Sequence, residues 1–373
     1  MHARPLPHDS HTERPVTPRP NPILLALLLA ASTASAADDP KTLMDEGHFR
    51  RAKVLIDAEA AKHPDDARTL YLQGYWLLGT GDAKSALPLS EKASALAPKD
   101  ADYRYQVAGC VGTMAEEAGK LKQFGLAKRF KREAEAALAL DPRNVRAIEG
   151  LAQFYSQAPG IVGGDDKRAY ELADSLVRID PARGRLLQYS LYSRDKKIEQ
   201  GDQALHQALA EAPGDYGVQM SMVRYLSSDT QKKYAEAEAH AKAAVGISPG
   251  RIGGYAALAG IYAHLGRWDD LDRILAESER AVPDNRAAYY QAGRVLLGDD
   301  KEPARAEKMF RYYLGAEPEI GAPTLAHAHW RLGLVIEKQG RKPEALAEVE
   351  QALALKPDLG DDAKKDLKRL KKG

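Results

Sequence analysis

Short apolar runs alternate with polar turns along the whole chain, and most of these runs end in a proline. Examples are SALAPKD, LALDPRN, VGISPGR and LALKPDL. The prolines in this setting lie 32 to 44 residues apart and are Pro64, Pro98, Pro142, Pro181, Pro213, Pro249, Pro283, Pro318 and Pro357. A unit of roughly 34 residues built from helical sequence is typical of an α-solenoid, in which helix pairs stack side by side.

Each interval predicts two antiparallel helices, a first helix A and a second helix B, with the proline ending helix B. Proline suits that place because it cannot continue a helix and because it restricts the residue before it. Small side chains at fixed distances from the prolines indicate where neighbouring helices approach closely. Twelve residues before a proline stand Ala52, Ala86, Ala169, Ala237, Ala306 and Ala345, and five residues before stand Ala93, Ala137, Ala208, Ala244 and Ala352.

Glycines mark two further places in the predicted helix A. A small residue recurs early in this helix, at Gly74, Gly293 and Gly333. A second glycine is expected to end the helix, because a positive φ angle costs glycine little, at Gly81, Gly266 and Gly340. The interval 184–213 follows the pattern least well, since Gly201 takes the place of the first alanine.

These residues resemble the tetratricopeptide repeat, whose pattern is W-x2-L-G-x2-Y followed by Gly, Ala, Phe, Ala and Pro within 34 residues. The segment 326–359 resembles it most, then 67–98 and 286–318, and the resemblance extends over about residues 40–358. It implies an all-α fold, a right-handed α-solenoid of antiparallel helix pairs that form a superhelix.

The expected domain organisation follows from this resemblance. Residues 37–358 would form the solenoid, with about eight full repeats after an incomplete first one. Residues 359–373 would form a C-terminal capping helix, since terminal repeats need a polar outer face. A basic recruitment tail is the alternative for the segment 361–372, DDAKKDLKRLKK.

Two intervals are longer than the others. The interval 99–142 carries about ten extra residues, which we interpret as longer helices, and 145–181 carries about five between its helices. We expect the second insertion to be a tight connection whose glycines adopt positive φ, with Asp165 or Asp166 capping helix B. A contact with a ligand or partner is the alternative function of this loop, whose residues of interest are Pro159, Gly160, Gly163, Gly164 and Asp165.

A phosphate cradle is disfavoured at this loop. No Gly-Lys-Ser/Thr motif follows Gly160 at the required spacing, and no strand is predicted before it. The surrounding stretch, NVRAIEGLAQFYSQAPGIVGGDDKRAYELA, resembles bacterial periplasmic tetratricopeptide proteins, including the T component associated with TRAP transporters. That resemblance implies association with a transporter binding protein.

The tetratricopeptide resemblance implies that helix A of each repeat lines a concave groove where a partner binds. Tyrosine and arginine recur at the groove positions, and both are favoured at binding hot spots. Arginine holds a carboxylate through two hydrogen bonds, so the groove should suit a peptide with acidic or C-terminal carboxylate groups. The alternative is packing between adjacent A helices. The candidate residues are Arg68, Tyr71, Tyr75, Tyr105, Arg146, Gln153, Tyr192, Arg224, Tyr290, Arg294 and Trp330.

The charge balance gives no electrostatic reason to bind nucleic acid or an anionic membrane. The formal net charge of the chain is +1, and beyond residue 36 the numbers of basic and acidic residues are equal. Cys110 is the single cysteine, which excludes an intramolecular disulfide and any site built from several cysteines. We expect Cys110 to be a buried small residue rather than a reactive thiol.

The N-terminal 36 residues are predicted to be a secretory signal. Their apolar stretch Ile23–Ala31 is too short to span a bilayer, and Ala34, Ser35 and Ala36 form a small-residue cleavage motif. Cleavage after Ala36 would leave a periplasmic or secreted protein without stable membrane insertion. A retained membrane anchor is the alternative.

No catalytic or metal-binding pattern stands out. His327 and His329 are two residues apart and point to different sides of a helix, and neither H-E-x-x-H nor G-x-S-x-G occurs. The sequence therefore predicts a non-enzymatic, periplasmic or secreted scaffold, without cofactor or metal, that binds a peptide or protein in its groove. The alternative function is an accessory component of a transport system that binds a small organic acid or lipid near the loop at 156–167.

Overall fold

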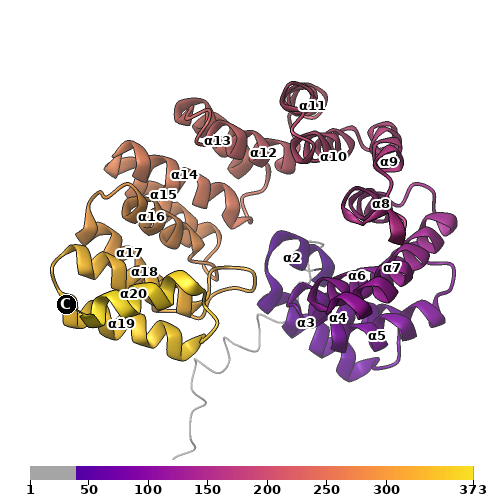
Figure 1. Cartoon of the computed structure of the whole chain (residues 1–373), viewed down its shortest axis with the longest axis horizontal. Coiled ribbons are helices and arrows are strands. Elements are labelled where there is room, and N and C mark those ends of the chain that lie inside the picture. The colour runs from indigo at the N-terminus through magenta and orange to yellow at the C-terminus, as the bar shows by residue number, and fades with distance from the viewer. Residues whose placement is uncertain (1–38, 373) are drawn as a thin grey trace, which may run out of the picture. The chain divides into compact units, whose positions relative to one another are not determined.

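The computed structural model describes residues 39–372, and all regular structure in that range is helical. Helices alternate between a first helix A and a second helix B of each pair (Figure 1). The A helices are α2 (Pro40–Glu46), α4 (Ala67–Gly79), α6 (Ala101–Glu117), α8 (Val145–Gln157), α10 (Pro181–Arg194), α12 (Tyr216–Leu226), α14 (Ile252–Leu265), α16 (Ala287–Gly298) and α18 (Leu325–Lys338).

The B helices complete the pairs, and one more helix follows the last pair. The B helices are α3 (Phe49–Lys62), α5 (Ala83–Leu96), α7 (Lys120–Leu140), α9 (Asp166–Ile179), α11 (Ile198–Glu211), α13 (Tyr234–Ile247), α15 (Trp268–Ala281), α17 (Pro303–Leu314) and α19 (Lys342–Leu355). The last helix is α20 (Asp361–Lys372), and a short 3-10 helix, η2 (Gly160–Val162), lies between α8 and α9.

Each helix packs against the next one in the chain, so the pairs stack in sequence order (Figure 1). Successive A helices also contact one another, most extensively α14 with α16 and only sparsely α8 with α10. This stacking of helix pairs confirms the all-α solenoid that the proline period predicts.

The proline positions agree closely with the helix ends. Eight of the nine prolines lie two residues after the last residue of a B helix, and Pro318 lies four residues after α17. Pro181 has a second role, because it is also the first residue of α10, and the Asp180 side chain accepts a hydrogen bond from the Arg183 amide at the start of that helix. The pair α10–α11 therefore begins without the usual connecting loop.

The recurring alanines are the closest contacts between helices. All eleven alanines of the two recurring positions are 0% exposed. The glycines of helix A are equally crowded: a Cβ atom on Gly333 would lie 2.7 Å from Val349 Cγ2. The turn glycines Gly81, Gly266 and Gly340 have φ angles of +90°, +67° and +78°, which confirms their predicted role at the ends of A helices.

The two long intervals differ in structure as expected. Helices α6 and α7 have 17 and 21 residues, so the extra residues of 99–142 extend a helical hairpin. In the other interval, Gly163 has a φ angle of +100°, and the Asp165 carboxylate caps α9 by accepting from the Arg168 amide at 3.1 Å. Gly160 and Gly164 do not have positive φ, so the expectation is wrong for these two glycines.

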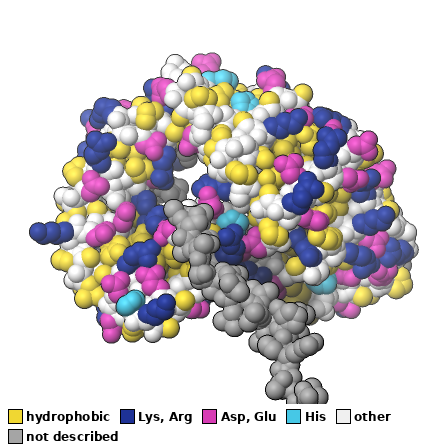
Figure 2. Space-filling model, turned by 180° about the vertical axis from the view of Figure 1, so that it is seen from behind, with side chains coloured by type: hydrophobic (Ala, Val, Ile, Leu, Met, Phe, Trp, Pro, Cys, Tyr) yellow, Lys and Arg dark blue, Asp and Glu magenta, His cyan; other side chains and the backbone are white. Residues whose placement is uncertain are grey.

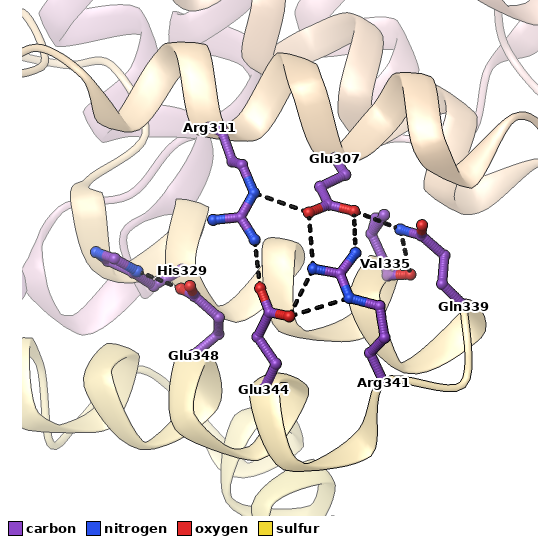
Figure 3. Close-up of polar contacts among 8 residues, drawn as sticks. All are labelled: Glu307, Arg311, His329, Val335, Gln339, Arg341, Glu344 and Glu348. Atoms are coloured by element: carbon purple, nitrogen blue, oxygen red, sulfur yellow. Dashed lines mark hydrogen bonds and ion pairs between the residues drawn. The ribbon is translucent and has the colours of Figure 1, made fainter.

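Polar contacts connect the B helices on the outside of the array. Glu307 of α17 accepts hydrogen bonds from Arg311 at 2.8 Å, Arg341 at 2.7 Å and Gln339 at 2.7 Å (Figure 3). Glu344 of α19 binds both of these arginines (Figure 3). The hydrogen bond from Arg341 lowers the pKa of Glu307 to about 2, so this carboxylate is ionised at neutral pH.

The predicted secretory signal lies outside the described residues. Within residues 39–372, no helix has both the length and the apolar character needed to cross a bilayer. Cys110 is 0% exposed, and burial raises the pKa of its thiol, as expected for a structural residue.

Candidate functional site

The most specific polar feature on the A helices surrounds Arg146 at the start of α8. Its guanidinium donates to the Tyr71 hydroxyl at 3.2 Å, and its Cζ lies 5.0 Å from the ring centre of Tyr75 and 5.3 Å from that of Tyr105. The four side chains come from three successive A helices, α4, α6 and α8. A cation over aromatic faces is an attractive contact whose strength increases when water is excluded.

Tyr71, Tyr75 and Tyr105 surround the Arg146 guanidinium, and we call these four residues the Arg146 cage. The three tyrosines carry no charge that would neutralise Arg146. Burial raises the pKa of Tyr75 to about 12, and burial also raises the pKa of Tyr71 and Tyr105. The nearby Asp102 makes its hydrogen bond elsewhere, because it accepts from the Asn144 side-chain amide at 2.9 Å. Asp102 acts on Arg146 only through its charge, which contributes to raising the pKa of Arg146, and no carboxylate among the described residues lies within ion-pair distance of the guanidinium.

A cavity of about 830 Å³ opens between α8 and α10, and Glu149, one helical turn after Arg146, is among the residues that line it. Residues from the A helices α8, α10 and α12 line it, together with Ile247 at the end of α13 and the loop residues Ser248 and Arg251 before α14. The lining residues that carry polar groups or aromatic rings include Glu149, Gln153, Arg183, Arg194, Tyr216 and Arg251.

The arginines of this cavity differ in their partners. Arg183 forms an ion pair with Glu149 at 2.6 Å, and Arg194 forms one with Asp166 at 2.7 Å. Arg251 instead lies over the ring of Tyr216, at 4.9 Å from its centre, and its buried Nε has no hydrogen-bond partner within the described chain. Arg251 is thus a second cation available to an incoming carboxylate.

A further cavity of about 670 Å³ continues along α12, α14 and α16. Arg224 and Arg294 line it, and each makes a hydrogen bond to a neutral neighbour, Ser221 and Gln291 respectively. Neither has a carboxylate within ion-pair distance among residues 39–372. Arg146, Arg224 and Arg294 of the A helices thus have no carboxylate within ion-pair distance among the described residues, whereas Arg311 of α17 and Arg341, which directly precedes α19, form ion pairs with Glu307.

The loop after α8 adjoins a different, apolar cavity of about 630 Å³. The long hairpin α6–α7, helix α8 and the loop residues Pro159 and Val162 line it. Its apolar and small lining residues include Gly109, Gly112, Phe124, Ala127, Phe130 and Phe154. The two irregular intervals of the sequence thus meet at one site, although Gly160 and Ile161 themselves point to solvent.

No group of three or more His, Cys, Asp or Glu side chains in the described part of the chain is arranged to hold a metal ion.

A family comparison agrees with the repeat pattern at both ends of the array. Residues 41–101 and 302–359 match a tetratricopeptide repeat model. These two segments carry tetratricopeptide repeats. A comparison with curated proteins finds no match.

Several solved structures of tetratricopeptide proteins resemble this chain in fold. Yeast Tom70 is 14% identical, with a TM-score of 0.49 over 94% of this chain and 89% of its own. The protein TTC0263 from Thermus thermophilus is 19% identical, with a TM-score of 0.45 over 50% of this chain and 94% of its own. PilW, a type IV pilus biogenesis factor, is 17% identical, with a TM-score of 0.44 over 60% of this chain and 98% of its own.

The repeats bring some of the predicted site residues together and place others elsewhere. Tyr71, Tyr75, Tyr105 and Arg146 form the cage, while Gln153, Arg224 and Arg294 line the adjoining cavities. The remaining candidates, Arg68, Tyr192, Tyr290 and Trp330, do not line the cavities described above.

These four residues make contacts within the array. Arg68 forms an ion pair with Glu59 of the preceding B helix at 2.8 Å. Tyr290 is 7% exposed and packs against Phe310 and Tyr313 of the B helix α17, whereas the packing alternative expected a contact between adjacent A helices. Trp330 donates to Asp366 of α20 at 3.0 Å, and the Tyr192 ring packs against Tyr170 of α9.

The sequence pattern misses four residues of the large cavity: Arg183, Arg194, Tyr216 and Arg251. Groove positions counted from the prolines require a loop before each A helix, but α10 begins at Pro181 itself. The groove face of α10 is consequently displaced from the expected positions, so the pattern indicates Tyr192 instead of Arg183 or Arg194. Arg251 immediately precedes α14, outside the helical positions of the pattern.

Proposed function

We propose that this protein is a non-enzymatic scaffold that binds an extended, acidic segment of a partner protein along its A helices. Tetratricopeptide repeats are typical of protein–protein interaction, and the A helices here contribute to two hollows of about 830 and 670 Å³. The surface outside the groove favours no single charge, since basic and acidic side chains are interspersed over the face in Figure 2.

The observation that carries this proposal is the caged guanidinium of Arg146. Burying a cation without a counter-ion is costly, and the tyrosine rings and one neutral hydroxyl only partly offset the lost hydration. A carboxylate from a partner would supply the missing charge through two parallel hydrogen bonds. Arg251 offers a second such contact on the far side of the 830 Å³ cavity.

Fluorescence anisotropy with labelled peptides rich in Asp and Glu tests the proposal. We expect binding that weakens with added salt, and we expect Arg146→Ala or Arg251→Ala to lower the affinity by about tenfold to a hundredfold, since each removes a hydrogen-bonded charge contact. Arg143→Ala is the matched control, because Arg143 is exposed in the loop before α8 and should not affect binding.

Two further probes define the partner class in the same assay. A peptide in which Gln and Asn replace the acidic residues should bind weakly, and a single-stranded oligonucleotide of equal charge should not compete. Equal affinity for the neutral peptide, or full affinity in the Arg146→Ala, Arg251→Ala double variant, would contradict the proposal. Effective competition by the oligonucleotide would assign the groove to nucleic acid instead.

The apolar cavity at the α6–α7 hairpin favours a second candidate, an accessory protein of a transport system that binds a lipid or small organic acid. Phe124, Phe130 and Phe154 line this cavity, and Lys120 at its edge supplies a cation for an acid headgroup. A fatty acid in a thermal-shift assay should then raise the unfolding midpoint, because a ligand of the folded state stabilises it. Ala127→Phe should abolish that shift by filling the cavity, and no shift with any lipid or acid removes this candidate.

We also propose that the chain is exported and cleaved after Ala36. The support is the apolar stretch Ile23–Ala31 and the small residues before the cleavage point. Mass spectrometry of the protein isolated from its native cells should give a mature N-terminus at Ala37, and a retained apolar stretch would show that it acts as an anchor.

A further inference from the structure

The turn between α2 and α3 contacts loops that lie more than 200 residues further along the chain. His48 in this turn is 4% exposed. Its Nδ1 lies 3.2 Å from the Asp284 carboxylate, and its Nε2 lies 2.9 Å from the Gly250 carbonyl oxygen. Gly250 follows α13 and Asp284 follows α15, so one side chain connects the first helix pair to two later inter-repeat loops.

A third loop, the one after α17, completes this contact. The Glu319 carboxylate accepts from the Arg50 amide at 3.2 Å, and the Arg50 guanidinium donates to the Glu317 carbonyl at 2.9 Å. The Arg50 amide is one of the first in α3, where amides have no partner within the helix. Glu319, which is 2% exposed, therefore acts as an N-cap supplied from a distant part of the chain.

The chemistry of His48 makes this contact dependent on a proton. Both ring nitrogens face oxygen acceptors, and a neutral imidazole can donate from only one of them. Only the imidazolium completes both hydrogen bonds. In addition, Asp284 Oδ1 and Glu319 Oε2 are buried without partners in the described chain, so the contact tolerates little further negative charge.

We propose that the first helix pair is a latch that fastens the start of the repeat array to the loops after α13, α15 and α17, and that the imidazolium of His48 holds it closed. The latch also adjoins the Arg146 cage, because Asp45 of α2 accepts from the Tyr75 hydroxyl at 2.7 Å.

The direction of the pH effect follows from the groups that face His48. The hydrogen bond from His48 to Asp284 raises the pKa of His48 above its usual 6.5, against the opposing effect of burial. A raised histidine pKa stabilises the closed state fully below pH 6.5, and this contribution is lost as the pH rises through the raised value.

The neighbouring acids and bases agree with this direction. The hydrogen bond from His48 lowers the pKa of Asp284 below its usual 3.8. This carboxylate is therefore already ionised at the pH values at which His48 loses its proton. Burial raises the pKa of Glu319, so the closed state also loses stability as this carboxyl ionises at pH values above 4.5. The remaining charged groups around the contact are Glu46 of α2, Arg50 and Arg51 of α3, and Arg286 of the loop after α15. We therefore expect the latch to open as the pH rises above 6.5.

Electron paramagnetic resonance distances between two spin labels test the latch in the full chain without any ligand. The labels are attached to Val54→Cys on α3 and Lys308→Cys on α17, both exposed, while Cys110 is buried and stays unlabelled. We expect one narrow distance at pH 5.5 and a longer, broader population at pH 8.5. His48→Ala should shift the ratio of closed to open molecules about tenfold towards open at pH 5.5, as expected for losing a charged hydrogen bond.

Two further variants keep the outcome decisive. Asp284→Asn removes the carboxylate partner and should open the latch at pH 5.5 even if His48→Ala fails to fold, which circular dichroism would reveal. His63→Ala is the matched control, because His63 is exposed at the end of α3 and should behave as the wild type. A wild-type distance that is the same at both pH values, or an Asp284→Asn distance as narrow as the wild type, overturns the proposal. Because no partner is present, this result does not depend on the proposed peptide binding.

Discussion

At the residue scale, the array depends on small side chains where helices cross. The alanines of the two recurring positions are fully buried because each faces a neighbouring helix at close range. These alanines bury little apolar area. They stabilise the array because their side chains are small enough to let neighbouring helices approach closely. A larger side chain forces shifts in the backbone or in neighbouring rotamers, which destabilises a well-packed interior.

Ala237 offers a direct comparison on one helix. Replacing Ala237 by Leu should lower the free energy of unfolding by about 1–3 kcal/mol, because the site is 0% exposed and cannot hold three more carbon atoms. Ala235→Leu, two residues earlier on the exposed side of α13, should change it by less than about 0.5 kcal/mol. Chemical denaturation of both variants measures the difference, and equal effects would show that the alanine position is not a tight contact.

Glu307 predicts a pH dependence of stability at the residue scale. Its pKa is lowered from 4.5 to about 2, so its interactions stabilise the fold above pH 4.5 and are lost as the pH falls through about 2. Glu307→Gln should cost about 2 kcal/mol at pH 7. The difference from the wild type should shrink between pH 4.5 and pH 2.5 in urea unfolding.

Glu350→Gln is the control for this experiment, because Glu350 makes a single exposed ion pair with Lys371. Its effect should be close to zero at every pH, as is usual for exposed pairs. A difference between Glu307→Gln and the wild type that stays constant down to pH 2.5 would mean that the ionised carboxylate is not what Arg341 and Arg311 stabilise.

At the scale of elements, the sequence predicts the helices well because their ends have local causes. Prolines after the B helices, turn glycines after the A helices and aspartate caps such as Asp165 act through their own backbone neighbourhood. The groove face is less predictable, since it depends on where each helix begins. At Pro181 a missing loop displaces the face of α10, and no local pattern distinguishes this proline from the others.

Helix α20 has the features of a cap for the last repeat, and we propose that role for it. Ala363 and Leu370 are buried, and Asp366 accepts from Trp330 of α18, while the opposite face is charged. Deleting residues 361–373 should lower the melting temperature by several degrees and increase dye binding to exposed apolar surface.

The control for this deletion is Lys365→Ala, which changes only a solvent-exposed residue of α20. This variant should melt within about 1 °C of the wild type, as is usual for surface substitutions. If the deletion also leaves the melting temperature and dye binding unchanged, α20 is not a cap, and the basic-tail alternative becomes the better description of this segment.

At the scale of the whole described chain, the important contacts are those that no sequence window contains. The Arg146 cage joins residues of three repeats, and the aromatic candidates divide between this cage and the core because burial depends on neighbouring pairs. His48 and Asp284 are 236 residues apart, and neither belongs to the repeat pattern. The repeat pattern therefore predicts the scaffold and part of the binding surface, but not the long-range contacts between its first helix pair and the later loops.

Hydrogen exchange of the full chain, with and without a bound acidic peptide, tests the central claim most directly. If the peptide lies along the A helices, amides of α8, α10, α12 and the start of α14 should become protected, and the B helices α9, α11 and α13 should exchange as before. Protection that appears on the B helices, or binding that leaves the amides around Arg146 and Arg251 unchanged, would contradict the claim that the A-helix surface is the binding site.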